Sequence, residues 1–199
     1  MLLLSEPRRH LTGLLLLVRG DARGLSLFDI SDDGLARSFS AYLWTLPAIV
    51  PYGIARRLVE LGMATDISGT LSFVFKFALN EAAGIVLPIL LLALASPLLG
   101  YRVLLRTLIV TWNWSALVYL PLVHLVAAPF FLLNLQSWSL GGLTFVALAL
   151  MLAMALLFTL QWRILTTVMG GNPQIRLLVV LILLLSPLAM LPLGTHLSS

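Results

Sequence analysis

The feature that most constrains the fold is a run of 18 residues without a charged side chain, "AAGIVLPILLLALASPLL" at positions 82–99. A helix needs about 20 mostly apolar residues to cross the roughly 30 Å hydrocarbon layer of a bilayer. The whole chain shares this character, because 60% of its 199 residues are hydrophobic and only 10% are charged. A soluble domain carries about 25% charged residues. We therefore predict an all-α, membrane-embedded protein.

Five apolar stretches are predicted to be transmembrane helices. Their approximate limits are 38–55, 71–99, 107–133, 140–161 and 177–194. Short connections make consecutive spans antiparallel neighbours, and no polar linker separates two apolar halves. We therefore predict one five-helix transmembrane domain over 37–199, preceded by a cytoplasmic N-terminal region over 1–36. Eight of the ten prolines lie in or at the ends of the spans, which predicts several proline-kinked helices.

The N-terminal region contains a short amphipathic segment, "RRHLTGLLLLVRGDARG" at 8–24. Its apolar part is followed by arginines instead of a small-residue cleavage site, so an interfacial helix fits better than a signal peptide. One face of this helix collects four apolar side chains: Leu11, Leu14, Leu15 and Val18. Four basic side chains are predicted to contact anionic lipid headgroups: Arg8, Arg9, Arg19 and Arg23.

The arginines also predict the orientation of the chain. With a cytoplasmic N-terminus, nine of the 12 basic residues fall on the inner side: Arg8, Arg9, Arg19, Arg23, Arg37, Arg102, Arg106, Arg163 and Arg176. The outer side keeps Arg56, Arg57 and Lys76. Such a bias is typical of the cytoplasmic side of membrane proteins. We expect a multi-pass protein of a bacterial inner membrane with a periplasmic C-terminus, and no nucleic-acid partner.

The stretch "FDISDDGLARSF" at 28–39 allows two interpretations. Asp29, Ser31, Asp33 and Gly34 match the first half of a calcium loop, but the twelfth position, which needs a bidentate glutamate, is Ser40. Alternatively, Ser31 or Asp32 caps a helix that begins near Asp33, with the carboxylates at its positive end. The missing ligand favours the helix start.

The candidate polar site is "FKFALNEAAG", which places Lys76, Asn80 and Glu81 at the outer half of the second span. If the membrane begins near Leu71, Glu81 approaches the midplane, where an ionisable group indicates a transport or relay site. If it begins near Ala82, the same residues are interfacial and solvated. The uncharged run after Glu81 is almost long enough to span alone and favours the interfacial position.

Enzymatic chemistry is not predicted. The chain has no cysteine, and its few acids and histidines are too scattered for a nucleophile with its base. His124 lies deep in the third span, where a lone histidine more often hydrogen-bonds a neighbouring helix than ligates haem or a metal. We expect no cofactor and no metal site.

The layout resembles that of the Yip1-like membrane proteins of bacterial type. The corresponding text is "SEPRRHLTGLLLLVRGD", a basic amphipathic opening, and "FDISDDGLARSF", a helix start before the first span. The resemblance covers span number, orientation and N-terminal layout, without a diagnostic motif. It implies a role in membrane organisation through contacts with other membrane proteins.

Two functions remain open from the sequence. The first is a non-enzymatic scaffold, assembly factor or accessory subunit that contacts other membrane proteins or itself. Ala149 and Ala153, one turn apart on the fourth span, would let a helix approach closely. The second is a small transporter or channel component whose polar path contains Lys76, Asn80 and Glu81.

Overall fold

The computed structural model describes residues 5–61, 69–132 and 140–186, and all regular structure within these ranges is helical. The described α-helices are α1 (Ser5–Val18), α2 (Asp32–Ser38), α3 (Ala41–Glu60), α4 (Thr70–Leu99), α5 (Leu105–Leu132), α6 (Leu140–Met169) and α7 (Pro173–Leu185). Two 3-10 segments, η2 (Ala22–Leu27) and η3 (Arg102–Leu104), join α1 to α2 and α4 to α5. The all-α prediction is confirmed.

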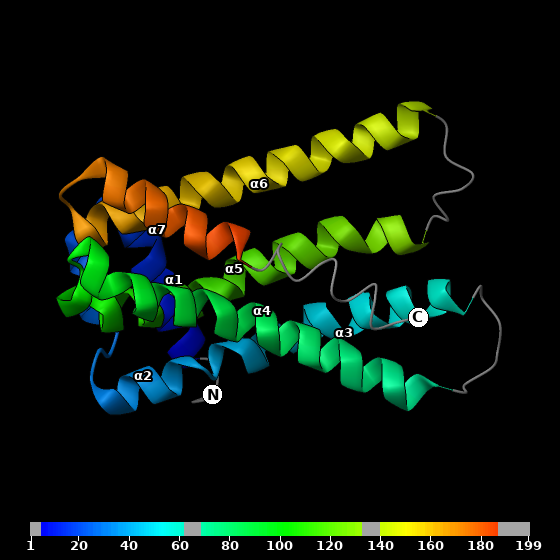
Figure 1. Cartoon of the computed structure of the whole chain (residues 1–199), viewed down its shortest axis with the longest axis horizontal. Coiled ribbons are helices and arrows are strands. Elements are labelled where there is room, and N and C mark those ends of the chain that lie inside the picture. Colours follow the sequence, from blue (N-terminus) through cyan, green and yellow to red (C-terminus); the bar gives the residue numbers. More distant parts are fainter. Residues whose placement is uncertain (1–4, 62–68, 133–139, 187–199) are drawn as a thin grey trace.

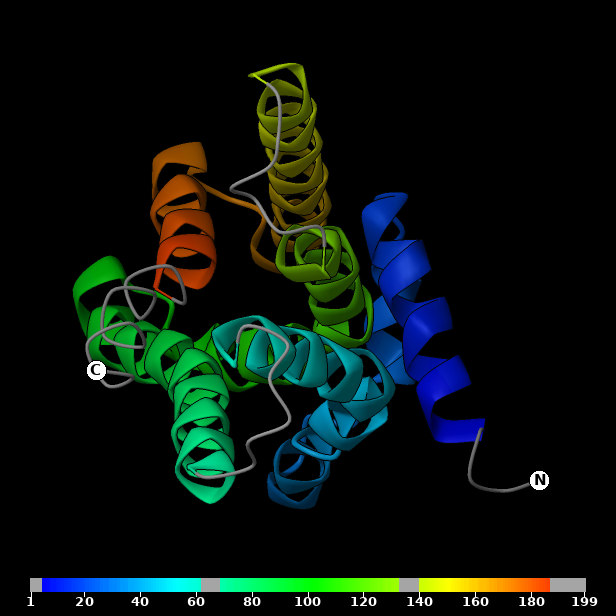
Figure 2. The same ribbon diagram turned by 90° about the vertical axis from the view of Figure 1, so that its right-hand side faces the viewer.

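Helices α3 to α7 run along the long axis of the molecule, whereas α1 lies across one end of the bundle (Figures 1 and 2). Helix α5 is central and packs against α1, α2, α3, α4 and α6. Its segment 108–116 is buried without interruption. This central position explains why the run includes both apolar and hydrogen-bonding side chains, since every face of α5 meets a neighbour.

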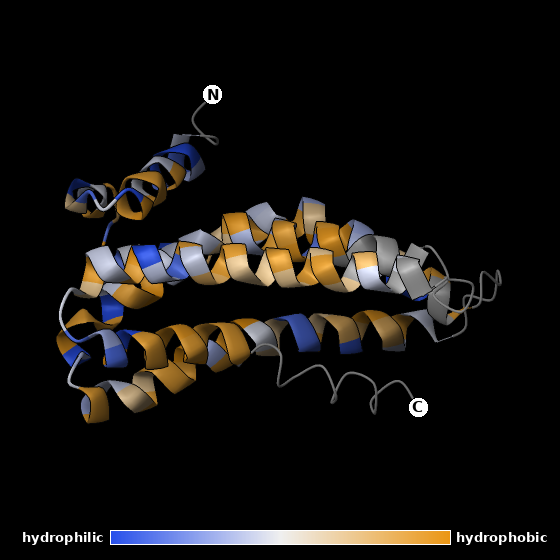
Figure 3. Cartoon of the chain, turned by 90° about the horizontal axis from the view of Figure 1, so that it is seen from above, coloured by the Kyte–Doolittle hydropathy of each residue, from blue (hydrophilic) through white to orange (hydrophobic). Residues whose placement is uncertain are grey.

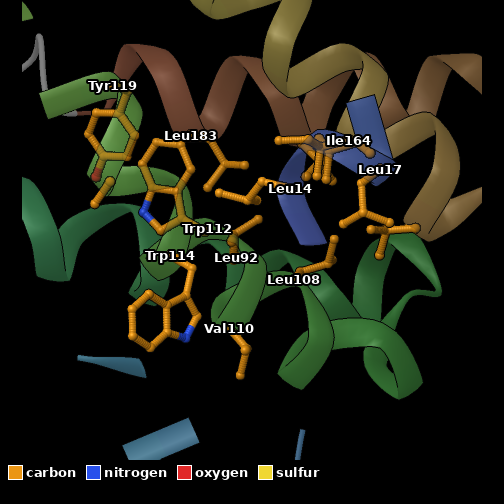
Figure 4. Packing of buried hydrophobic residues seen from close by; sticks show 14 of the residues in the cluster. Leu14, Leu17, Leu92, Leu108, Val110, Trp112, Trp114, Tyr119, Ile164 and Leu183 are labelled. Carbon is orange, nitrogen blue, oxygen red and sulfur yellow. The ribbon is translucent and has the colours of Figure 1, made fainter. Parts of the chain in front are cut away.

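One hydrophobic core joins the N-terminal region to the long helices. Leu14 and Leu17 of α1 are buried in the same cluster as Trp114 of α5 and Ile164 of α6 (Figure 4). Burial of one leucine side chain contributes about 1.5–3 kcal/mol. Residues 5–38 are therefore packed onto the bundle as part of it.

Within the described ranges, three segments are long and apolar enough to cross a membrane: Thr70–Leu99, Arg102–Val126 and Ala147–Met169. Most of the residues in these segments are hydrophobic (Figure 3). Leu98 of α4 is 86% exposed and Phe145 of α6 is 72% exposed. Continuous apolar surfaces of this kind are compatible with a membrane protein, in which lipid covers the side chains that no other helix covers.

Two helices continue past the predicted ends of their spans. Helix α3 continues through Arg56 and Arg57 to Glu60, and α6 continues eight residues beyond the predicted limit of 161, to Met169. Arginine and glutamine end an apolar run without ending a helix, because they adopt helical backbone readily. The last predicted span begins inside α7, and its part after 186 lies outside the described residues.

The helix start ahead of the first span is confirmed. The Ser31 hydroxyl accepts a hydrogen bond from the Gly34 N–H at 3.1 Å, and α2 begins at Asp32. The helix is separate from the predicted first span, however, because α2 ends at Ser38 and α3 begins at Ala41. The Ser38 hydroxyl donates to the Leu35 carbonyl at 2.6 Å. A serine bond of this kind to the preceding turn slightly destabilises a helix, which is consistent with the end of α2 at Ser38.

The nine arginines predicted on the inner side belong to segments that meet at one end of the bundle, which we call the arginine-rich end. Helices α4 and α6 end there, beside α1 and α2, whereas α3 and α5 end at the opposite side (Figure 1). Arg163 of α6 donates to the Val18 carbonyl of α1 at 2.5 Å, and Arg106 of α5 lies 2.5 Å from the Asp32 carboxylate of α2. The guanidinium groups therefore also fasten the N-terminal helices to the bundle.

Candidate functional site

An ionisable pair joins α4 and α5. Nε2 of His124 lies 3.6 Å from Oε2 of Glu81, and the two side chains are 6% and 22% exposed. Nδ1 of His124 lies 2.8 Å from the Leu120 carbonyl, which can only accept, so Nδ1 carries a proton. A neutral imidazole would then turn the lone pair of Nε2 toward the carboxylate. An imidazolium would instead point an Nε2–H at the carboxylate.

A third helix completes this site. The Tyr52 ring of α3 meets the His124 ring edge-on, with 4.7 Å between centroids and 74° between planes. Arg56, one turn further along α3, hydrogen-bonds the Tyr52 side chain. The site thus contains an acid, an imidazole, a phenol and a guanidinium on three neighbouring helices, although Glu81 and His124 are 43 positions apart in sequence.

Of the three predicted polar-path residues, only Glu81 belongs to this site. Glu81 faces His124, whereas Lys76 and Asn80 are half-buried on α4. Among the described residues no ion pair or hydrogen bond links either of them to Glu81. The five-residue separation of Lys76 and Glu81 turns them about 140° apart on a helix, which accounts for this difference.

Arg57, one of the three basic residues predicted on the outer side, contacts the next helix. The Arg57 guanidinium lies 5.3 Å from the centre of the Phe73 ring and donates to the Thr70 hydroxyl at 3.4 Å. These contacts join the end of α3 to the start of α4.

A second polar cluster is buried at the arginine-rich end. The Asn113 amide of α5 donates to the Ser38 hydroxyl at 2.8 Å and accepts from the Tyr42 hydroxyl at 3.0 Å. The Gln161 amide of α6 donates to the Ser115 hydroxyl at 2.9 Å. Sequence reasoning missed these contacts. The signal was present, because "TWNWS" and "TLQWR" place amides inside apolar stretches, where they require partners.

The predicted headgroup contacts fall into two groups. Arg8, Arg9 and Arg19 are exposed. Arg23 instead forms a two-pronged pair with the Asp21 carboxylate, at 2.7–3.0 Å, which lowers the pKa of that carboxyl group. Among the described residues, Arg8, Arg9 and Arg19 therefore form no ion pair, whereas the charge of Arg23 is balanced by Asp21.

The apolar face predicted for α1 is divided. Leu14 is buried against the bundle, whereas Leu11 and Leu15 are 40% and 49% exposed. The face in contact with the protein contains His10, Gly13 and Leu17 instead. An amphipathic pattern alone does not distinguish these two faces, because both have leucines.

The small-residue face on α6 is also divided. Ala153 is 6% exposed and is buried within this chain, whereas Ala149 is more exposed. Only Ala149 thus has surface left for a second helix.

The calcium-loop interpretation does not fit the structure. The Asp29 carboxylate accepts from the Ser31 N–H at 2.9 Å and pairs with Arg37. The hydrogen bond from Ser31, and then the Arg37 charge, lower the pKa of Asp29. A Cβ atom on Gly34 would lie 2.2 Å from the Asp29 carbonyl oxygen. Glycine is therefore needed for the close approach of two backbone segments. In the described ranges, no three metal-ligating side chains gather to hold an ion.

Comparisons with protein families, with curated proteins and with solved structures find no match to this chain.

Proposed function

We propose that this chain is a non-enzymatic, five-span protein of a bacterial inner membrane with a cytoplasmic N-terminus and a periplasmic C-terminus. In this proposal it acts as a scaffold, assembly factor or accessory subunit, in the manner of the Yip1-like proteins. The observation that carries it is the gathering of arginine-bearing elements at the end crossed by α1, while the apolar faces of α4 and α6 stay uncovered. Positive charge at one end and bare hydrocarbon along the sides suit an anionic inner leaflet and its lipid core.

The partner-binding part of the proposal is tested on α6. Ala149→Leu fills the surface where a second helix would approach, whereas Ala155→Leu changes an exposed alanine of the same helix. Purification in a mild detergent should recover a membrane protein, or a second copy of this chain, at fixed stoichiometry. We expect Ala149→Leu to reduce that recovery severalfold and Ala155→Leu to leave it unchanged. Equal effects of both variants, or no stoichiometric partner, would contradict the proposal.

The Glu81–His124 pair favours a second candidate, a small transporter or channel component. Ionisable groups within membrane-spanning helices are costly and typical of proton or ion pathways, and Glu81 and His124 form such a pair between α4 and α5. Proteoliposomes with an internal pH-sensitive dye should then show proton entry that Glu81→Gln reduces at least tenfold. The matched control is Asp33→Asn, which removes an exposed carboxylate of α2. Equal flux through the wild type and Glu81→Gln would exclude this function.

The depth of Glu81 separates the two candidates further. The native chain lacks cysteine, so Glu81→Cys introduces a single reactive thiol. A membrane-impermeant reagent added from the outside labels this thiol if the position is interfacial. Leu71→Cys, at an 86% exposed position near the start of α4, is the accessible control. Protection of position 81 alone supports the transport function.

A further inference from the structure

A cavity of about 330 Å³ lies at the arginine-rich end, between the first turns of α1 and α2. This volume falls within the range of small-ligand sites. Its lining includes Glu6, Arg9, His10, Asp29, Arg37 and Trp114. The cavity is separate from the Glu81–His124 pair, which belongs to other helices and to other positions along α5.

The wall of the cavity is an aromatic stack. The ring of His10 lies between Trp114, at 3.8 Å, and Phe28, at 5.3 Å, measured between centroids. The His10 side chain is buried, with 4% of its surface exposed. Its Nδ1 atom has no hydrogen-bond partner among the described residues. Burial, and then the neighbouring Arg9 charge, lower the pKa of His10 to about 4. His10 is therefore neutral at pH 7.

The charges of the lining balance. The lining contains two carboxylates, of Glu6 and Asp29, and two guanidinium groups, of Arg9 and Arg37. Asp29 and Arg37 form an ion pair with each other. Arg9 has no ion pair in the part of the chain that the structure describes, and Glu6 meets only the neutral His10, at 3.9 Å. An anionic ligand would be repelled by the carboxylates, and a cation by the guanidinium groups. A ligand with both charges satisfies both sets.

We propose that this cavity binds a small zwitterion in which an ammonium group and a phosphate are joined by a short linker. Arg9 holds the phosphate and Glu6 the ammonium group, while the Trp114–His10 stack forms the wall against which the linker rests. The same head occurs free, as phosphoethanolamine, and on a membrane lipid, as phosphatidylethanolamine.

The first experiment uses the purified full-length chain in detergent, with phosphoethanolamine as the probe and thermal protection as the readout. We expect phosphoethanolamine to bind at least tenfold more tightly than inorganic phosphate or ethanolamine, because each of these fills only half of the site. Arg9→Gln and Glu6→Gln should each weaken binding about tenfold. Arg8→Gln, which removes the adjacent exposed arginine outside the cavity, should change it less than twofold, and Arg9→Lys should keep most of it.

Unfolding midpoints without the probe establish that Arg9→Gln is folded, and Arg9→Lys tests the charge if it is not. Equal binding of phosphate alone, equal effects of Arg8→Gln and Arg9→Gln, or no protection of the wild type in any setting would overturn the proposal.

The second experiment identifies the source of the zwitterion. The chain is placed in nanodiscs of phosphatidylglycerol, with or without phosphatidylethanolamine, and the apparent affinity for phosphoethanolamine is measured. A severalfold weaker affinity in the presence of phosphatidylethanolamine shows that the lipid head occupies the cavity. An unchanged affinity supports a free zwitterion as the ligand. Absence of binding in both nanodiscs and in detergent counts against either source.

Discussion

At the scale of single residues, Gly34 leaves the least room for a side chain among the described glycines. A methyl group there would lie 2.2 Å from the Asp29 carbonyl oxygen, so the turn before α2 must open to accept it. We expect Gly34→Ala to lower the free energy of unfolding by about 1–3 kcal/mol. Gly84→Ala is the control, because no atom lies within 4 Å of its Cβ, and it should be neutral or up to about 1 kcal/mol stabilising. Thermal unfolding in detergent distinguishes them.

His10 makes stability depend on pH. Because its pKa is lowered from 6.5 to about 4 in the fold, the unfolded chain binds more protons between these values. Stability therefore rises with pH through this window and is lost as pH falls from about 6.5 to about 4, by at most about 3 kcal/mol. His10→Phe keeps an aromatic ring between Phe28 and Trp114 and removes the titration. Denaturant midpoints at pH 7 and 4.5 should show the wild type losing more stability than the variant.

At the scale of elements, the cap of α2 is a testable consequence of the sequence. Ser31→Ala removes the acceptor of the Gly34 N–H and should cost about 1 kcal/mol, whereas Ser31→Gly should cost only a few tenths. Hydrogen exchange at the Gly34 amide measures this directly. We expect exchange to be about fivefold faster in the alanine variant. Similar exchange in wild type and Ser31→Ala would show that the hydroxyl does not stabilise the helix.

The elements that could be predicted are those specified by local chemistry. The predicted end of α4 at 99 agrees with the structure, because an uninterrupted apolar run such as 82–99 has one low-energy solution in lipid. The Ser31 cap was predicted because it depends on a neighbour three positions away. The separation of α2 from α3 was not predicted, because a break at Ser38–Ser40 depends on how the two helices pack on α5.

The candidate site was only partly predictable for the same reason. Glu81 was recognised as an unusual group in an apolar helix, but its pairing with His124 depends on the relative rotation and depth of α4 and α5. Neither quantity is encoded in local spacing. The division of the α1 leucines between the protein and the exterior likewise depends on where α1 lies on the bundle.

At the scale of the whole molecule, the arrangement of the helix ends predicts a two-sided labelling pattern. Val103, in η3 between α4 and α5, is 94% exposed at the arginine-rich end, and Leu71, at the start of α4, is 86% exposed at the opposite end. About 28 residues of helix separate them, which corresponds to roughly 42 Å and exceeds the hydrocarbon thickness. If the chain spans the membrane as proposed, these two positions face different compartments.

The absence of cysteine makes this prediction direct to test. In intact inverted vesicles, whose cytoplasmic face is outward, an impermeant thiol reagent should label Val103→Cys and spare Leu71→Cys. In spheroplasts the pattern should reverse, because arginine-rich segments stay on the cytoplasmic side. Detergent should make both thiols reactive, which controls for local burial. Labelling of both variants from one side would show that α4 does not cross the bilayer, and a reversed pattern would place the N-terminal helices outside.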